Sequence, residues 1–444
     1  MTELFSEKRW TGEFFPPDAY EKRFCGEIQY SPEEGVVFSY AITGRDAPAA
    51  TEVLHGVLSS GDRCTLVGRF QPYGGAGFSK KSDLVTGHTT LHGKAGFWYL
   101  AIGDFLAQDE RFADIDFSLT NLQEFFYPGK NSVAYSEKPI YSVKTPFGRM
   151  EVGNTATFSL LYSDITSQIY TEDSAALDEL IRAFEEIRAK YPDSYFSFKE
   201  DIAYRILLKF SPALTIRDAY EHVTSFANLF ALLIYSPVHP ESIHLRKPGP
   251  DGRSITIELY LSMVLDPRTI KVISAQNLFH YDMPITQSTA PFDAIVSAWL
   301  QAPHDHSPIV SSIQHETGFR TTHTAHGDIV LYATQLESIT HGAGRKDKKY
   351  QYPLESHGSQ RLRDGLMNSF GKSSLEETAV AIGELRNEIV HEGRPKHWLA
   401  TLSLRQLIRI AQYLQLTIIG YLLTDIGVPV DAIAAYQDRY SPAA

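Results

Sequence analysis

Short runs of apolar residues interrupted by turn-forming residues mark the beginning of the chain as β-rich. Runs of this kind cover residues 35–42, 64–70, 96–102 and 154–161, and Gly, Pro, Asp and Ser bound them. Several short strands with turn signals between them are typical of a β-sandwich or an open barrel. We therefore predict a β-rich N-terminal domain over residues 1–165.

Residues 166–285 combine helical and extended patterns. Apolar residues recur at helical spacing over 174–190 and over the more apolar segment 215–235, whereas 195–208 and 255–264 favour strands. The pattern leaves two alternatives open. This stretch is either a separate mixed α/β segment or the closing part of the N-terminal domain.

From residue 286 the apolar positions follow a helical period. We predict helices over 292–300, 328–339, 375–391 and 402–426, and the last carries a continuous apolar stripe suited to a core. The fold class is therefore α+β, with the β-rich N-terminal region followed by an all-α helical bundle over 286–444.

The third of these helices has clear start and stop signals. Ser373 and Ser374 each precede a Glu by three residues, as in a capping box. Gly393 and Pro395 follow the helix and predict its end. Between the second and third predicted helices lies a polar segment, 341–372, which is rich in Gly, Lys and Arg.

Charge is distributed unevenly along the chain. The net charge of −12 argues against broad, non-specific coating of nucleic acid, which requires an excess of Lys and Arg. From His341 to Arg409, however, the chain contains twelve basic and eight acidic residues, so this stretch is locally positive. It is either an RNA path or an ordinary solvated surface. The candidate phosphate contacts are Arg345, Lys346, Lys348, Lys349, Arg394 and Lys396.

The compartment is predicted from cysteine usage and from the absence of targeting signals. Cys25 and Cys64 are too few and too isolated for a stapled secreted fold, although a single disulfide between them stays open. The first residues lack a basic segment followed by an apolar one. The longest apolar stretches fall short of the roughly 20 residues of a membrane span. We expect a cytoplasmic protein with no membrane partner.

A histidine-rich segment raises the question of a metal site. It contains His304, His306, His315, His323 and His326, with Asp305 and Glu316. The spacing is irregular, no cysteine joins the histidines, and no H-E-x-x-H pair is present. A polar linker explains the segment better than zinc, so we predict no metal and no cofactor.

The strongest candidate for chemistry lies at the end of the third predicted helix. Asn387 and His391 are four residues apart and share a face of an α-helix. Arg386 lies about 100° round from Asn387, but its long side chain can reach that face. Glu384, seven residues before His391, lies on nearly the same line. A titratable imidazole, a permanent cation and an amide thus gather within a turn and a half.

These groups suit metal-independent cleavage of RNA. An imidazole can take the proton of a ribose 2′-OH near neutral pH. The guanidinium of Arg386 can hold the phosphoryl oxygens as negative charge develops. Asn387 can orient the imidazole or the phosphate. The expected products are a 2′,3′-cyclic phosphate and a 5′-OH. The plain alternative is a surface arginine and a histidine favoured by the helix dipole.

The sequence Arg386-Asn387-Glu388-Ile389-Val390-His391 resembles the R-x4–6-H motif of HEPN ribonucleases, including the polar residue after the arginine. A long β-rich region ahead of a C-terminal HEPN domain resembles the ApeA family of bacterial anti-phage proteins. By motif position, the resemblance implies that Arg386 and His391 are the catalytic pair, with Asn387 in support. Glu337 and Glu384 are weaker candidates for accessory groups.

The same resemblance implies a biological setting. It implies a homodimer or higher oligomer with the active centre at the subunit interface, and abortive infection through cleavage of host RNA, with transfer RNA as a candidate substrate. The N-terminal region would be the sensor or restraint, and a phage-derived molecule the trigger. The alternative hypothesis is a non-catalytic binding or dimerisation module that recognises a protein, nucleotide or glycan.

Overall fold

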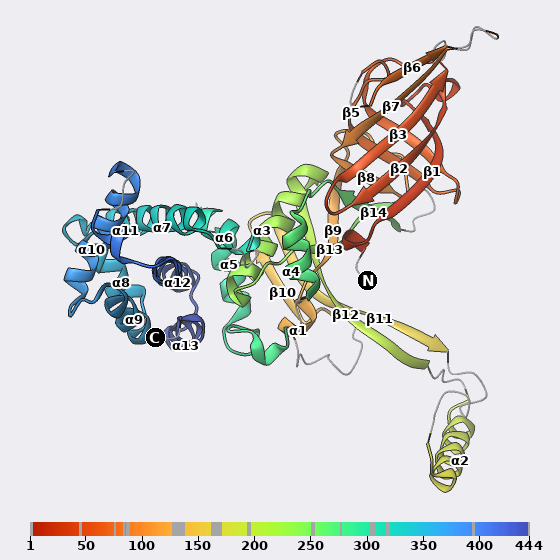
Figure 1. Cartoon of the computed structure of the whole chain (residues 1–444). Coiled ribbons are helices and arrows are strands. Elements are labelled where there is room, and N and C mark those ends of the chain that lie inside the picture. The colour runs from red at the N-terminus through yellow and green to blue at the C-terminus, as the bar shows by residue number, and fades with distance from the viewer. Residues whose placement is uncertain are drawn as a thin grey trace.

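The structure is a computed structural model of the chain. It describes residues 3–43, 47–74, 77–82, 85, 89–126, 138–160, 171–192, 197–249, 254–275, 278–301, 307–316, 320–392 and 396–442. Figure 1 shows strands at one end of the molecule, a helical bundle at the other, and a mixed layer between them. The predicted α+β class, with strands first and helices after, is confirmed.

Within the described residues, fourteen antiparallel strands join in one sheet of order β10-β11-β12-β9-β13-β14-β8-β5-β4-β1-β2-β3-β7-β6. Their bounds are β1 Lys8–Phe15, β2 Phe24–Ser31, β3 Gly35–Thr43, β4 Thr51–Leu58, β5 Arg63–Phe70, β6 Ser79–Ser82, β7 Thr89–Phe97, β8 Tyr99–Ile102, β9 Arg111–Leu119, β10 Tyr141–Thr145, β11 Gly148–Leu160, β12 Ser197–Thr215, β13 Pro240–Pro248 and β14 Ser254–Leu261.

The N-terminal half of this sheet curls into an open barrel. The backbone N–H of Trp98, just after β7, donates to the carbonyl of Val67 in β5 at 2.8 Å, so β7 returns to β5. Gly68 permits this contact, because a Cβ there would lie 2.9 Å from the Cα of Phe97. Aromatic rings fill the interior, with the Phe14 and Phe38 centroids 4.6 Å apart. Of the two predicted β arrangements, the barrel is the one found.

The second half of the sheet carries helices on one face. Thr215 caps α3 (Ile216–Ile234), and its side chain accepts from the Asp218 N–H at 3.3 Å. Phe226 of α3 packs on Phe117 of β9 with their centroids 6.3 Å apart. The short helices α1 (Leu122–Phe126) and α4 (Pro267–Ala275) lie in the same region. The strands of residues 166–285 belong to the same sheet as those of the first 165 residues, because β12 and β13 pair with β9, and β14 pairs with β8.

Helix α2 (Ser174–Lys190) forms where its apolar period predicts, and Asp173 caps it. No residue of α2 is buried, and Leu180 and Ile187 of its apolar stripe are 43% and 44% exposed. The stripe predicts a helix correctly. It does not, in this structure, form part of a core. Figure 1 shows α2 beyond the end of the β11–β12 pair, away from the other helices.

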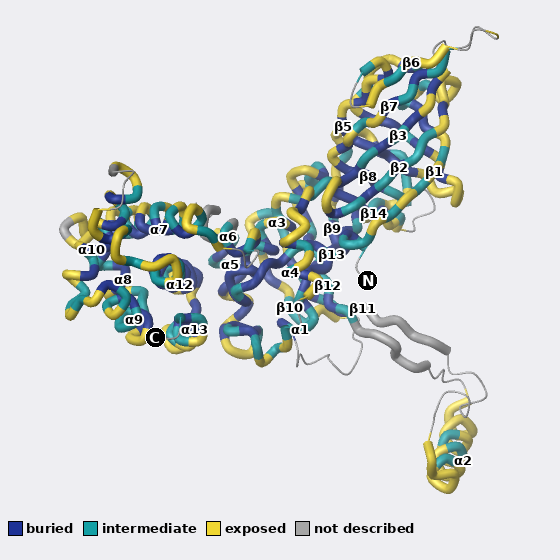
Figure 2. The backbone as a smooth tube through the Cα atoms, in the orientation of Figure 1, coloured by how far each residue is buried: buried dark blue, intermediate teal, exposed yellow. Residues whose placement is uncertain are grey.

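The helices after residue 286 are α5 Phe292–Gln301, α6 Ser307–Gln314, α7 Thr322–Gly342, α8 Gln351–His357, α9 Gln360–Phe370, α10 Leu375–Asn387, α11 Trp398–Thr401, α12 Leu404–Asp425 and α13 Val430–Tyr440. Helix α12 contributes most of the bundle core, as its apolar stripe predicts (Figure 2). It is long and apolar enough to cross a membrane, but 72% of that apolar window is buried. Helix α5 instead packs on the sheet region, where Phe292 contacts Phe126 at 5.3 Å between centroids.

The polar segment 341–372, in which the sequence pattern predicts no helix, contains α8 and α9. Ser359 caps α9 by accepting from the Leu362 N–H at 3.2 Å, and Gly371 ends it in the left-handed conformation, with φ +62°. Leu354, Leu362 and Leu366 are fully buried. A few well-spaced leucines are enough to anchor short helices, even where the other residues are polar.

The two cysteines do not pair. Cys25 on β2 is exposed and free, whereas Cys64 on β5 is buried and free. Burial, with a smaller effect of Asp62, raises the pKa of the Cys64 thiol to about 12. Cys64 is therefore a packing residue of the barrel.

Candidate active site

The predicted third helix ends earlier than its pattern suggests. Ser374 caps α10, accepting from the Glu377 N–H at 3.2 Å, while Ser373 donates to the Glu377 carboxylate at 3.1 Å. The α-helix stops at Asn387 and continues as a π-turn over Glu388–Glu392. The predicted stop residues Gly393 and Pro395 lie outside the described residues.

His391 lies in the π-turn that follows α10. A π-turn closes an i to i+5 hydrogen bond and so takes one residue more than an α-turn. Residues four apart stay on nearly the same side of such a turn, so the predicted alignment of Asn387 with His391 stays a prediction. Single π-turns inside helices occur frequently at functional sites.

The guanidinium of Arg386 reaches its neighbour as predicted. One terminal nitrogen donates to the Asn387 side-chain oxygen at 3.1 Å. Arg386 is half-buried, and its Nε is buried with no hydrogen-bond partner in the part of the chain that the structure describes. One donor of a fixed cation is thus left unused at the end of α10.

Helix α7 places a carboxylate opposite this arginine. Glu337 accepts from the hydroxyl of Tyr350 in a short hydrogen bond, and its Oε1 lies 3.5 Å from Lys349 Nζ. Burial alone would raise the pKa of Glu337, but Tyr350, Lys349 and Arg386 together lower it. The ring of Tyr350 fits against α10 at Gly383, where a Cβ would lie 3.2 Å from it. The structure therefore brings Glu337, Lys349 and Arg386 into one charged cluster.

Glu388 lies inside the motif and is only 6% exposed. Its carboxylate accepts from the backbone N–H groups of residues 396, 397, 398 and 399 at 2.7, 3.1, 2.8 and 3.2 Å. Burial by itself would raise the pKa of Glu388, and these four donors outweigh it, so the pKa is lowered. Glu388 thus caps α11 and folds the chain after the motif back against the π-turn.

Glu384 also contacts this returning segment. Its carboxylate accepts from the indole N–H of Trp398 at 3.0 Å, and Lys372 lies 5.6 Å from the centre of the same ring. Glu384 therefore supports α11, and no described contact joins it to His391. His391 itself is exposed and forms no hydrogen bond or ion pair with any described residue.

The predicted phosphate contacts are partly neutralised. Lys348 lies 3.8 Å from Glu355, and Lys349 pairs with Glu337. Arg345, Lys346 and Lys396 are exposed. Arg394 lies outside the described residues. This basic stretch therefore offers fewer free cations than its sequence indicates.

A second group of cations was not singled out by the sequence. Arg361 of α9 and Arg409 of α12 both lie close enough to Tyr413 to act on its pKa, which burial raises and these two arginines lower. Arg405 precedes Arg409 by four residues and shares its helix face. None of the three forms a hydrogen bond or ion pair with a described side chain. We call Arg361, Arg405 and Arg409 the arginine patch.

The histidine-rich segment does not form a described metal site. Within the described ranges, no three His, Cys, Asp or Glu side chains gather as metal ligands would. His304, Asp305 and His306 lie outside those ranges. Glu316 instead forms an ion pair with Arg320.

Sequence reasoning missed Glu388 and Tyr350 as parts of the site. The partners of Glu388 are backbone N–H groups, which leave no mark in a sequence. Tyr350 directly follows the basic residues 345–349, but its role depends on α7 and α10 meeting. The one signal available in the sequence was the position of Glu388, an acidic residue inside the motif between Arg386 and His391.

Comparison with known proteins supplies one match. Residues 9–299 match the family described as ApeA N-terminal domain 1, which covers the barrel, the mixed layer and most of α5. Neither a curated protein nor a solved structure matches the chain. The matched residues end before the cluster around Arg386.

Proposed function

The chain belongs to the ApeA family, which sets it among proteins of anti-phage defence, and from this premise we propose that its helical bundle is a metal-independent endoribonuclease of the HEPN class. The observation that carries the proposal is the end of α10. There a half-buried arginine with an unused donor, an amide and an exposed histidine follow one another through a π-turn.

The proposed reaction uses the 2′-OH of the RNA as nucleophile. The imidazole of His391 takes the 2′-OH proton, and the 2′-oxygen forms a bond to the adjacent phosphorus. The P–O5′ bond breaks, and the leaving oxygen takes a proton from solvent. Arg386 stabilises the negative charge on the phosphoryl oxygens. The products are a 2′,3′-cyclic phosphate and a 5′-OH, and DNA is not cut because it lacks the 2′-OH.

The neighbouring residues have positioning roles in this scheme. Glu337 attracts the Arg386 guanidinium from the α7 side, and Asn387 accepts one of its N–H groups. Glu388 fixes the segment after the π-turn. Glu384 acts through Trp398. Because His391 is exposed, the proposed site is open to solvent on one side. This favours a second copy of the chain, or the RNA itself, as the molecule that covers it.

The proposed partners are RNA, with transfer RNA a candidate, and a second copy of the chain in a homodimer or higher oligomer. The N-terminal region is the proposed sensor or restraint, with a phage-derived trigger. Its contacts with the bundle support this role, because Tyr436 of α13 donates to the carbonyl of Leu232 in α3 at 2.8 Å. This contact joins the sheet region directly to the bundle, as a restraint acting from one on the other requires.

The test compares His391→Ala with His323→Ala, an exposed histidine at the start of α7. Purified proteins are incubated with total RNA, with and without EDTA and with and without an extract of phage-infected cells, and the RNA ends are sequenced. We expect cyclic-phosphate ends with the wild type and His323→Ala, and at least a hundredfold fewer with His391→Ala. Equal cleavage by folded His391→Ala would remove the proposal. Loss of cleavage in EDTA would contradict the metal-independent mechanism. No cleavage by any variant would favour a non-catalytic binding module.

A further inference from the structure

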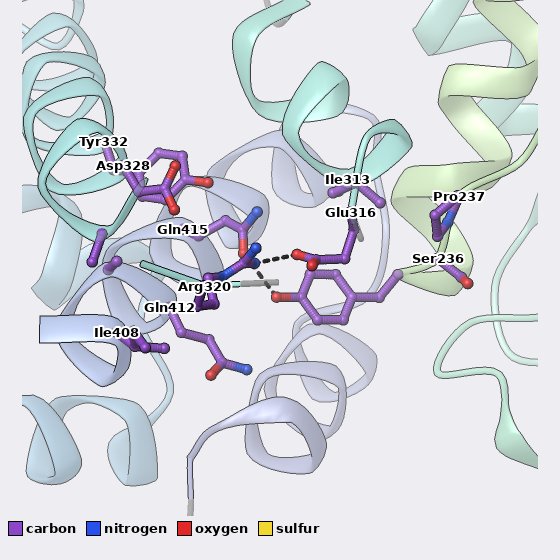
Figure 3. A pocket seen from close by; sticks show the side chains of 13 residues that line it. Ser236, Pro237, Ile313, Glu316, Arg320, Asp328, Tyr332, Ile408, Gln412 and Gln415 are labelled. Carbon is purple, nitrogen blue, oxygen red and sulfur yellow. Dashed lines mark hydrogen bonds and ion pairs between the residues drawn. The ribbon is translucent and has the colours of Figure 1, made fainter. Parts of the chain in front are cut away.

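A cavity of about 230 Å³ lies where the sheet region meets the helical bundle (Figure 3). Four segments line it: the chain after α3, the end of α6, and one face each of α7 and α12. The lining thus comes from both halves of the molecule. The cavity is separate from the cluster around Arg386 and contains none of its residues.

One side of the cavity is held by a buried amide. Gln415 of α12 accepts from the Tyr235 hydroxyl at 2.8 Å and donates to the Ser312 hydroxyl at 2.9 Å. Gln415 is 7% exposed, so its amide joins α3, α6 and α12 at one point. These two hydrogen bonds join the three helices at the wall of the cavity.

The charges of the lining do not balance. Arg320 forms an ion pair with Glu316, as Figure 3 shows. The lining also contains the carboxylate of Asp328 from α7, which has no hydrogen bond or ion pair with any described residue. Burial raises the pKa of Asp328, the charge of Glu316 raises it further, and Arg320 opposes both. The carboxylates of Asp328 and Glu316 therefore have only the guanidinium of Arg320 near them as a positive charge. A cation that enters the cavity would reduce the repulsion between the two carboxylates.

We propose that the cavity binds a small organic cation through a guanidinium or primary ammonium group. Asp328 and Glu316 receive the cationic group, and Ile408, Ala411 and Ile313 contact its aliphatic part. Drug-sized ligands occupy cavities of roughly 300 to 1,000 Å³. A volume of about 230 Å³ selects a smaller molecule and leaves little room for a nucleotide.

Binding here would couple the two halves of the chain, because the ligand contacts both the segment after α3 and the bundle helices. A ligand that prefers one arrangement of this junction stabilises that arrangement. The binding itself does not depend on the ribonuclease proposal, and its test uses no RNA.

The test measures binding of agmatine to the full chain by isothermal titration calorimetry at pH 7.5. Three variants accompany the wild type. Asp328→Asn removes the unpaired charge, Ala411→Met fills the cavity without altering a charge, and Asp178→Asn is a charge-matched control on the exposed helix α2. Circular dichroism checks that each variant is folded. We expect at least a tenfold loss of affinity for Asp328→Asn and for Ala411→Met, and no change for Asp178→Asn.

Two outcomes would overturn the proposal. The first is that agmatine does not bind the wild type, or binds wild type and Asp328→Asn equally. The second is that AMP binds where agmatine does not and loses affinity in Arg320→Gln, which would make the cavity an anion site.

Discussion

At the scale of single residues, the carboxylate of Glu388 organises the end of α10. It is one side chain in contact with four successive backbone N–H groups, and it is almost completely enclosed. Such charge-assisted hydrogen bonds are the stronger ones in proteins. The π-turn that carries His391 is therefore fixed by a residue that touches no substrate in the proposed reaction.

Replacement of Glu388 tests this role. Glu388→Gln keeps the size of the side chain but removes its charge, so we expect a loss of about 1 to 3 kcal/mol in the free energy of unfolding at pH 7. Urea denaturation measures it. Glu376→Gln, at the start of the same helix but exposed, is the control.

The pH dependence of this loss follows from the lowered pKa of Glu388. An unfolded glutamate has a pKa of about 4.3. The stabilisation by the charged carboxylate is complete above that value and is lost as the pH falls through the lower pKa of the folded state. The difference between wild type and Glu388→Gln should be constant from about pH 5 to 8 and shrink below about pH 4.3. If the difference in the free energy of unfolding between wild type and Glu388→Gln grew on acidification, the stabilising role of the charged carboxylate would be contradicted.

At the scale of elements, α9 and α12 present three arginines that form no ion pair with a described side chain. Lys348 and Lys349, which follow α7, each lie beside a glutamate, whereas the arginine patch forms no ion pair with a described side chain. Helix α9 leads from Arg361 to Phe370, which packs on Trp398 beside the motif. This path spans roughly 14 Å of helix rise, so RNA in the proposed site could also contact the patch.

The arginine patch is tested by charge reversal in a His391→Ala background that binds without cutting. We expect Arg361→Glu/Arg405→Glu/Arg409→Glu to weaken binding of a single-stranded RNA. We also expect the plot of log Kobs against log salt to become less steep. The magnitude of its negative slope should decrease by about 2, since each of the three lost phosphate contacts contributes roughly 0.7. Fluorescence anisotropy at several salt concentrations measures both.

The matched control reverses three exposed cations on α2, Arg182, Arg188 and Lys190. This change alters the net charge of the protein by the same amount. If the control weakens binding as much as the patch variant, the effect is general repulsion and the patch is not an RNA contact.

At the scale of the whole molecule, the sheet region and the bundle meet through buried contacts. Tyr436 is fully buried and donates to the Leu232 carbonyl, and its ring packs on Tyr235, 5.9 Å away between centroids. Nearby, Arg439 donates to the Tyr281 carbonyl at 3.1 Å. These contacts join segments that lie 158 to 204 residues apart in the chain, and they bring the two halves into direct contact.

Tyr436→Phe should weaken this junction. The change leaves the Leu232 carbonyl without its hydroxyl donor inside the protein, at an expected cost of about 1 to 3 kcal/mol. Hydrogen exchange followed by mass spectrometry should show faster exchange both at the end of α3 and in α13. Tyr20→Phe, a 54% exposed tyrosine of the barrel, is the control. Faster exchange confined to α13 would show that the two halves are not coupled there.

The sequence by itself determined the strand-rich beginning, the helical end, and the core role of α12, because those patterns depend on periodicity along the chain. It also located Arg386, Asn387 and His391 on a helix end. Tertiary structure decided how the chain continues after that helix, since the Glu388 carboxylate in the π-turn accepts from the backbone N–H groups of 396–399.

Tertiary structure also decided which charges are free. Lys349 and Arg345 look alike in the sequence, but Lys349 meets Glu337 across the bundle. The apolar stripe of α2 resembles that of a core helix, yet no described element covers it. Periodicity fixes what each segment can form, whereas burial, pairing and the junction between the two halves arise from contacts between segments far apart in the chain.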